Sequence, residues 1–301
     1  MINSLTVTNL SNESLTFDLR RPEDSGFLIS DISGLGPVVA NINSTELASS
    51  DGAVYNSARL GARNIVITFI FLPNASIEDT RLLSYRLFPI KKKVFLTIKT
   101  ENRICETFGY VESNSPNIFS REVGTQISIM CPDSYFFSTE INTTIFSSII
   151  PVLAFQFFND SLVAGISEFG QVNNLTSGIV YYEGEADVGF LMHILITGVV
   201  ANLVIFNSMT GESLMIDTTR LAALTGSGLI NGDEVQISTI KGDKYIILIR
   251  GGIETNILNS LTKTSDWIHL TTGDNIIGYS ADSGVANVQL RVENRIVYEG
   301  V

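Results

Sequence analysis

Residues 63–73 read Arg-Asn-Ile-Val-Ile-Thr-Phe-Ile-Phe-Leu-Pro, and this stretch decides the fold class. From Ile65 to Leu72 the chain is almost continuously apolar and rich in β-branched and aromatic side chains, a composition that favours a strand. Pro73 ends the run because proline has no N–H to give to a sheet. We therefore predict a central strand, buried on both faces, in a protein that is mainly β.

Shorter strands are expected on both sides of this run. Apolar and polar residues alternate, as they do in half-buried strands, at residues 5–7, 15–19, 94–98 and 127–131. A polar turn at 100–102 joins 94–98 to a returning strand at 104–111. Short strands separated by turns favour a β-sandwich or split barrel over a parallel sheet with crossover helices.

One helix is predicted between these strands, from Ser76 to Phe88. Ser76 is suited to the N-cap, and Thr80, Leu83 and Leu87 recur on one face. Pro89 then ends the helix. This single amphipathic helix should cover the open side of the first domain.

The stretch between Gly34 and Arg63 has few apolar residues and many Ser, Ala, Asn and Gly. A connection of that length in a compact domain is usually functional or disordered. We interpret it as an extended arm or hairpin that finds its partner on another subunit.

A domain boundary is expected after residues 131–135. Residues 1–137 carry 12 basic and 14 acidic side chains, a balance of −2, whereas residues 138–301 carry 7 and 17, a balance of −10. The second half continues with short strands at the spacing of an antiparallel sandwich. The predicted fold is therefore two β domains, 1–137 with one helix and an arm, and 138–301.

Composition excludes several classes of protein. The chain is 45% hydrophobic and 17% charged, which is incompatible with intrinsic disorder. Neither half has the clustered Lys and Arg that nucleic-acid binding needs. Cys105 and Cys131 form no framework and are expected to be buried thiols. The first residues show no secretory signal, and residues 189–206 read as two buried strands rather than a membrane span.

No enzyme motif is recognisable. The two histidines, His193 and His269, alternate with large apolar residues and are expected to be core or sheet-surface side chains. The pair Asp233-Glu234 and the single acid Asp274 follow glycines, where acids commonly cap turns. We therefore expect no catalytic, cofactor-binding or metal-binding residues, and no cofactor.

Ordered segments throughout the chain resemble one protein family. The amino half contains Gly26-Phe27-Leu28 to Gly34-Leu35-Gly36-Pro37, then Arg63-Asn64-Ile65-Val66-Ile67, the helix leading into Lys92-Lys93-Val94, and Cys131-Pro132-Asp133-Ser134-Tyr135-Phe136. The carboxyl half contains Asn207-Ser208-Met209-Thr210-Gly211-Glu212-Ser213-Leu214, Asn231-Gly232-Asp233-Glu234-Val235, Ser265-Asp266-Trp267-Ile268-His269-Leu270 and Gly273-Asp274-Asn275-Ile276-Ile277-Gly278-Tyr279. Together they resemble the distal tail proteins of bacteriophages with long, non-contractile tails. Ser134 and Thr272 stand where the family often has proline. The segment from Thr218 to Ile230 resembles an insertion relative to the other members of the family.

The resemblance implies an amino domain related to tail-tube subunits and a galectin-like carboxyl sandwich. It implies a homohexameric ring at the distal tail tip of the virion, assembled in the cytoplasm of the host bacterium. The implied partners are the tail-tube protein, a tail-tip protein, and baseplate or receptor-binding proteins. DNA would pass through the ring without sequence-specific binding, and no membrane is involved. The near-neutral half, residues 1–137, is expected to suffice for the ring, with the acidic half pointing outward.

Two other functions are alternatives to this structural role. A carbohydrate-binding, lectin-like module would need an exposed aromatic platform, and the single tryptophan, Trp267, is predicted to pack in the core instead. A cell-wall hydrolase is disfavoured because neither a histidine-rich metal site nor a nucleophile motif is recognisable.

Overall fold

The computed structural model describes residues 1–46, 48, 51–73, 76–150 and 171–301. Side chains are described for all of these residues except 147–150 and 171–174. The chain forms two compact units, Met1–Glu140 with Val297–Val301, and Ile141–Ile296. All described strand pairs are antiparallel, and the fold is mainly β as predicted. Neither helix among these residues has the length and apolar composition for crossing a membrane.

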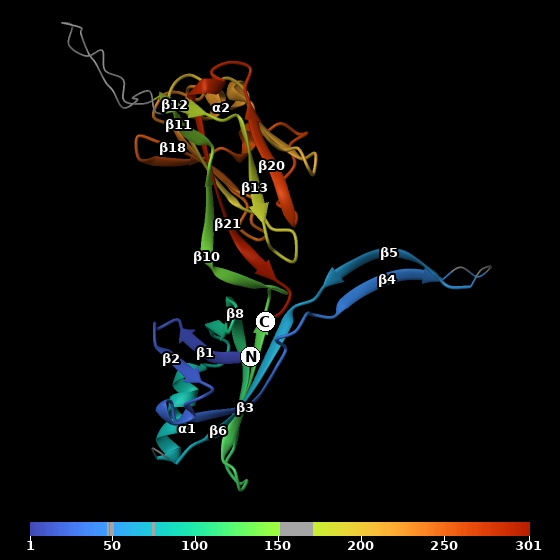
Figure 1. Ribbon diagram of the computed structural model, residues 1–301, viewed down its shortest axis with the longest axis vertical. Coiled ribbons are helices and arrows are strands. Elements are labelled where there is room, and N and C mark those ends of the chain that lie inside the picture. Colours follow the sequence, from blue (N-terminus) through green and yellow to red (C-terminus); the bar gives the residue numbers. More distant parts are fainter. Residues whose placement is uncertain (47, 49–50, 74–75, 151–170) are drawn as a thin grey trace, which may run out of the picture. The chain divides into compact units, whose positions relative to one another are not determined.

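The amino unit consists of short strands and one helix (Figure 1). Its elements are β1 (Ile2–Asn9), β2 (Ser14–Asp18), β3 (Phe27–Ser33), β4 (Ala40–Glu46), β5 (Ala53–Leu60), β6 (Arg63–Phe71), α1 (Ile77–Leu87), β7 (Lys93–Thr100), β8 (Ile104–Asn117), β9 (Gly124–Cys131) and the start of β10 (Phe136–Ile145). The long strand β8 pairs with β7 through its first half and with β9 through its second half. It therefore joins the layer β2-β1-β7 to the layer β3-β6-β9, as in a split barrel.

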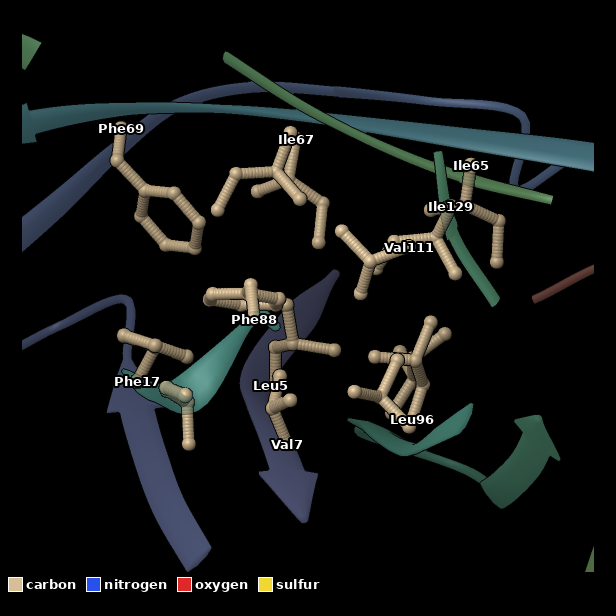
Figure 2. Packing of buried hydrophobic residues seen from close by; sticks show 14 of the residues in the cluster. Leu5, Val7, Phe17, Ile65, Ile67, Phe69, Phe88, Leu96, Val111 and Ile129 are labelled. Carbon is tan, nitrogen blue, oxygen red and sulfur yellow. The ribbon is translucent and has the colours of Figure 1, made fainter. Parts of the chain in front are cut away.

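The core of the amino unit lies between these two layers (Figure 2). Leu5, Val7 and Leu96 of one layer face Ile67 and Ile129 of the other, and all five are buried. Phe17, Phe27 and Phe69 form an aromatic cluster with ring centres 4.8–5.4 Å apart, where each pair adds about 0.5–1.5 kcal/mol beyond its buried area.

Helix α1 is confirmed within a residue of its predicted ends and places Leu87 and the following Phe88 in the core. Ser76 is the N-cap residue as predicted, although its side chain makes no capping hydrogen bond.

Strand β6 is central, with β3 on one side and β9 on the other. The prediction that both of its faces are buried is wrong. Arg63, Ile65, Ile67, Phe69 and Phe71 are buried, whereas the alternate residues are exposed or half-buried. The strand is half-buried because the two layers of the amino unit cover only its inner face.

The carboxyl unit is an antiparallel sandwich (Figure 1). Its elements are β11 (Ser147–Ile150), β12 (Gln171–Asn174), β13 (Ser177–Tyr182), β14 (Leu191–Ile196), β15 (Leu203–Asn207), β16 (Ser213–Ile216), α2 (Thr218–Thr225), β17 (Glu234–Ser238), β18 (Tyr245–Arg250), β19 (Ile253–Asn256), β20 (Gly273–Ser280) and most of β21 (Val288–Tyr298). One sheet runs β19-β18-β17-β14-β21 and the other β13-β20-β15-β16. Residues 189–206 supply β14 and β15, one to each sheet, which confirms two strands there.

Helix α2 lies in the segment 218–230, which was predicted to be a local insertion. The Asp217 carboxylate accepts hydrogen bonds from the backbone of Thr219 and Arg220 at its start, and Gly226 closes it in the left-handed conformation. An Asp N-cap and a glycine after the last turn are standard helix boundaries, and these two residues are the signal that was missed.

Candidate functional site

The predicted arm of the amino unit is a β-hairpin. Strands β4 and β5 pair with each other and, among the described residues, with no other strand. They extend away from the other strands of the unit (Figure 1). Every described residue of the two strands is exposed except Leu60, which is half-buried. An isolated two-stranded hairpin is marginally stable in water, so the arm has the exposure of a segment that is stabilised by a partner.

The two faces of this hairpin differ in polarity. Residues directly opposite each other share a face, and the pairs Ile42 with Ala58 and Ser44 with Tyr55 lie on one side. Ile42 and Tyr55 are 67% and 64% exposed. The opposite side carries Asn41, Arg59, Asn43, Ser57 and Thr45, with Val54. One-sided apolar alternation is the pattern of a strand that is buried on one face, and in a single copy nothing described covers that face.

Arg63 anchors the base of the hairpin. Its side chain is 2% exposed. Its Nη1 donates to the carbonyl oxygens of Gly34 and Gly36 at 2.7 and 2.6 Å, and its Nε and Nη2 donate to that of Ser134 at 3.1 and 2.7 Å. Nη2 also donates to the Glu299 carbonyl at 2.6 Å. The guanidinium therefore ties both ends of the arm's connection to residue 134 and to the last residues of the sequence.

Burial governs the electrostatics of Arg63. Desolvation lowers the pKa of its guanidinium, partly offset by the nearby Cys131. The carbonyl dipoles around it and the ring of Phe136 beneath it replace part of the lost hydration. Cys131 is itself a buried free thiol, whose pKa burial raises to about 11. A thiol in that state is a poor nucleophile, and Cys105 is buried as predicted as well.

Three of the segments that carry the family resemblance meet at Arg63. Arg63 stands at the start of β6, and its guanidinium contacts the turn around Gly34-Leu35-Gly36 and the stretch Ser134-Tyr135-Phe136. The contribution of Glu299 had no counterpart in the sequence analysis. A backbone carbonyl carries no side-chain signal, so only the fold reveals it.

Gly34 is required by a close approach of two backbone segments. Its φ is +84°, and a Cβ built on it would lie 2.0 Å from the carbonyl oxygen of Asn64. Any side chain there would displace the turn whose carbonyls Arg63 binds.

Both histidines are tied to carboxylates on the carboxyl unit. Nδ1 of His193 lies 3.0 Å from Glu234 Oε1, and Nδ1 of His269 lies 2.7 Å from Glu212 Oε1. His193 is a sheet-surface residue on β14 as predicted, whereas His269 lies outside the strands. Hydrogen bonds from His193 and then Gln236 lower the pKa of Glu234. Within the described residues, no cluster of His, Cys, Asp or Glu could hold a metal ion.

The acids singled out in turns have structural partners. Asp233 is 1% exposed and is paired with Arg250 at 2.7 Å through both of its oxygens. It also accepts the Ile230 N–H, as a turn-capping acid does. Arg250 reaches on to the Ser227 hydroxyl and the Gly228 carbonyl, which holds the segment after α2 against β18. Asp274 lies within β20 rather than in a turn.

The prediction that Trp267 packs in the core is wrong. Ile268 is buried there, and Trp267 is half-buried in a stretch outside the strands. Alternation alone left open which of the two neighbours is buried. The Lys244 ammonium lies 5.2 Å from the centre of the Trp267 ring. Glycan-array binding would test the lectin alternative directly.

A solved phage protein has a similar fold. No family model and no curated protein matches the sequence. The crystal structure of the SPP1 Dit protein (gp 19.1), described as a paradigm of hub adsorption apparatus in phages that infect Gram-positive bacteria, aligns with a TM-score of 0.64 at 12% identity. The alignment covers 97% of this chain and 99% of that one.

Two structures of the phage P2 baseplate in its activated conformation, with strontium and with calcium, also contain similar chains. Each aligns at 12% identity, with TM-scores of 0.49 and 0.47 and coverage of 97% and 98% of this chain and of their own. The SPP1 alignment spans both units, so the resemblance to distal tail proteins is confirmed at the level of the fold, and this chain has the fold of the phage SPP1 Dit protein.

Proposed function

We propose that this chain is a structural protein of a bacteriophage virion, a homohexameric hub at the distal end of a long tail. The observation that carries the proposal is the fold shared over 97% of the chain with the SPP1 Dit protein. In this role the chain connects the tail tube to tail-tip, baseplate and receptor-binding proteins. It performs no catalysis and uses no cofactor, and DNA passes through the ring without sequence-specific contacts.

The amino domain, residues 1–137, forms the ring in this proposal. Its balance of −2 lets copies approach, whereas contacts between the acidic halves would be repulsive. The exposed hairpin β4–β5 supports the same arrangement, because its apolar face needs a cover that a neighbouring copy supplies. A contact in which an arm of one copy reaches a different surface of the next is heterologous, and such contacts close into rings.

The galectin-like carboxyl domain, residues 138–301, points outward and carries other tail proteins. Its balance of −10 is tolerable when neighbouring domains are separated by more than the Debye length of about 8 Å at physiological salt. An acidic surface of that kind also steers basic partners and fixes their orientation.

The mass of the full chain in solution tests the proposal. Light scattering or native mass spectrometry should give six copies per particle, a mass that neither a monomeric lectin nor a hydrolase predicts. Deleting residues 41–56 should give a folded monomer. A hexamer that survives this deletion would remove the arm from the ring contact, and a full chain that is monomeric at all concentrations would refute the hub.

A further inference from the structure

Strand β13 is the edge of its sheet. The sheet runs β13-β20-β15-β16, and within the described residues no strand pairs with the outer side of β13 (Figure 1). The opposite edge, β16, is covered: the N–H groups of Thr262 and Asp266 donate to the carbonyls of Met215 and Ser213. The β16 edge of this sheet is therefore hydrogen-bonded by a neighbouring segment, whereas within the described residues the β13 edge has no paired strand.

The backbone register shows which groups of β13 face outward. The Tyr279 N–H donates to the Thr176 carbonyl at 2.8 Å, so these two residues form a hydrogen-bonded pair. Hydrogen-bonded and non-hydrogen-bonded pairs alternate along antiparallel strands. It follows from the register that Ser177, Ile179 and Tyr181 direct their N–H and C=O groups away from β20. In agreement, the carbonyl of Ile276, opposite Ile179, accepts from Ser208 on the other side.

The side chains at this edge are apolar and exposed. Ile179 and Tyr181 are 62% and 61% exposed, and Ile276, directly opposite Ile179, is 37% exposed. Next along the same face, the Phe206 ring lies over Gly278, where a Cβ would come within 2.5 Å of it. Backbone groups and apolar side chains thus coincide on one strip.

Nothing in β13 protects this edge. Sheet edges are normally blunted by lysine, proline, bulges or inward charges, because an open apolar edge is a template for another strand. Ser177–Tyr182 contains no charged residue and no proline, and its pairing with β20 has no bulge. An unprotected edge of this kind is expected where pairing with another chain is its purpose.

The charges around the strip indicate the chemistry of the partner. Residues 175–190 and 271–280 contain four acids, Glu183, Glu185, Asp187 and Asp274, and no Lys or Arg. Asp274 lies opposite Tyr181. A second copy of β13 would bring the same acids and no base, whereas a basic segment would be attracted.

We propose that β13 is a docking edge for an extended segment of a different protein, with alternating apolar residues flanked by Lys or Arg. The segment adds to the sheet as a strand next to β13. Its main-chain groups bond to those of Ser177, Ile179 and Tyr181, and its apolar side chains pack against Ile179 and Ile276. This inference rests on the proposed role of the carboxyl domain as the carrier of other tail proteins, and it names the surface used.

The test uses the full chain and a short acetylated peptide of alternating threonine and isoleucine with a lysine at each end. Binding is measured by calorimetry, and hydrogen exchange of the Ser177, Ile179 and Tyr181 amides is followed by NMR. The peptide should bind and slow exchange at these three amides, while a peptide N-methylated at every residue, which has no N–H on either edge, should do neither. Ile179→Pro removes one outward N–H without touching the bonds to β20, and should weaken binding about tenfold or more. Ile253→Val, at an exposed isoleucine of β19 outside the strip, is the control and should bind as the wild type does.

Three outcomes would overturn the inference. They are peptide binding without protection at the three amides, binding unaffected by Ile179→Pro in a folded variant, and amides already protected in the free chain because another part of it covers β13. If Ile179→Pro does not fold, Tyr181→Lys provides the same test, because it places a base among the four acids of the strip and should weaken binding of the lysine-flanked peptide. The particle mass is recorded on the same samples, so a failure of the hub shows as a lost hexamer and a failure of the docking edge does not.

Discussion

The guanidinium carbon of Arg63 lies 4.2 Å from the centre of the Phe136 ring. The two residues are 73 positions apart in the sequence, one at the start of β6 and one at the start of β10. Between them they close the base of the β4–β5 hairpin, because Arg63 also binds the carbonyls of Gly34, Gly36 and Ser134. The rigidity of the arm's attachment therefore depends on one buried cation.

Replacing Arg63 with lysine should destabilise the amino unit. An ammonium keeps the charge but cannot reach all the carbonyls that the planar guanidinium joins. Each buried acceptor left without a donor costs about 1–3 kcal/mol, so a total loss of about 3 kcal/mol or more is expected. Hydrogen exchange of the β6 amides during denaturant titration measures the stability of this unit. Arg59→Lys, on the exposed hairpin, should stay within about 0.5 kcal/mol of the wild type; equal effects from both variants would contradict the role given to Arg63.

Two glycines of one turn should respond oppositely to alanine. Gly34 has φ +84° and a backbone oxygen 2.0 Å from the position of a Cβ, whereas Gly36 has nothing within 4 Å and no positive φ. Gly34→Ala should cost more than about 2 kcal/mol in the free energy of unfolding. Gly36→Ala should be neutral or slightly stabilising, because alanine restricts the unfolded chain. Urea denaturation of both variants decides the matter, and a tolerated alanine at 34 would show that the turn adjusts freely.

A charge on the apolar face of the hairpin should break the ring, and the same charge on the polar face should not. Ile42 and Asn43 are neighbours that point to opposite faces. Burying an isoleucine contributes about 1.5–3 kcal/mol, and a buried lysine adds a desolvation cost. Ile42→Lys is therefore expected to shift the native mass from six copies toward one, while Asn43→Lys keeps the hexamer. Retention of the hexamer by both variants would place the arm outside the contact.

Protonation of Glu234 should make the carboxyl unit less stable in acid. Its pKa is lowered by hydrogen bonds from His193 and then Gln236. A carboxylate whose folded pKa lies below its unfolded value stabilises the fold above the unfolded pKa, and this is lost as the pH falls through the folded pKa. The difference in stability between the wild type and Glu234→Gln should thus be present at neutral pH. It should disappear when the pH falls below the usual pKa range of glutamate. The Glu234 side chain is 37% exposed, so solvent screening keeps the effect small, below about 1 kcal/mol.

The Glu234 carboxyl signal in NMR gives a direct reading of the same effect. His193→Gln should raise its titration midpoint toward that of an ordinary glutamate. A midpoint that does not move in this variant would show that the hydrogen bond from His193 has no influence on the carboxylate.

Local pattern was sufficient for much of the fold. Period-two alternation located β7 and β9, the polar turn at 100–102 located the start of β8, and the apolar stripe with Pro89 located α1. Gly242, in the left-handed conformation, lies in the connection between β17 and β18. Each of these signals acts within a few residues, which is why it can be seen in a sequence.

The features that were missed depend on contacts between distant residues. The burial of Ile268 rather than Trp267 depends on packing between distant residues, and one face of β6 stays exposed because none of the described strands covers it. Only the register of β13 with β20 shows that Ser177, Ile179 and Tyr181 direct backbone groups outward. The hairpin between Gly34 and Arg63 was anticipated from its composition, but its two-faced character follows from a register that includes a bulge near Asn43.

The last residues of the sequence illustrate the same point and lead to a final prediction. Val297–Val301 belong to the amino unit, where Val301 donates its N–H to the Leu35 carbonyl at 3.0 Å and Glu299 offers its carbonyl to Arg63. The Arg103 guanidinium covers the Tyr298 ring at 4.5 Å. An amino-terminal fragment that ends near Phe137 lacks all of these contacts. Such a fragment should therefore still form rings, but hydrogen exchange of its β6 amides should show a lower stability than that of the amino unit in the full chain.

Graded truncation of the full chain separates the contributions. Removing Gly300 and Val301 breaks the bond to Leu35 and uncovers part of the core that Val301 packs against, a loss of about 1–2 kcal/mol. Removing Glu299 as well takes one acceptor from the buried guanidinium of Arg63, and a hydrogen bond to a charged group contributes about 1.5–3 kcal/mol. The second step should therefore be at least as large as the first when the β6 amides are followed by hydrogen exchange. If the second step costs nothing, water has replaced the Glu299 carbonyl at Arg63, and the last residues do not hold the base of the hairpin.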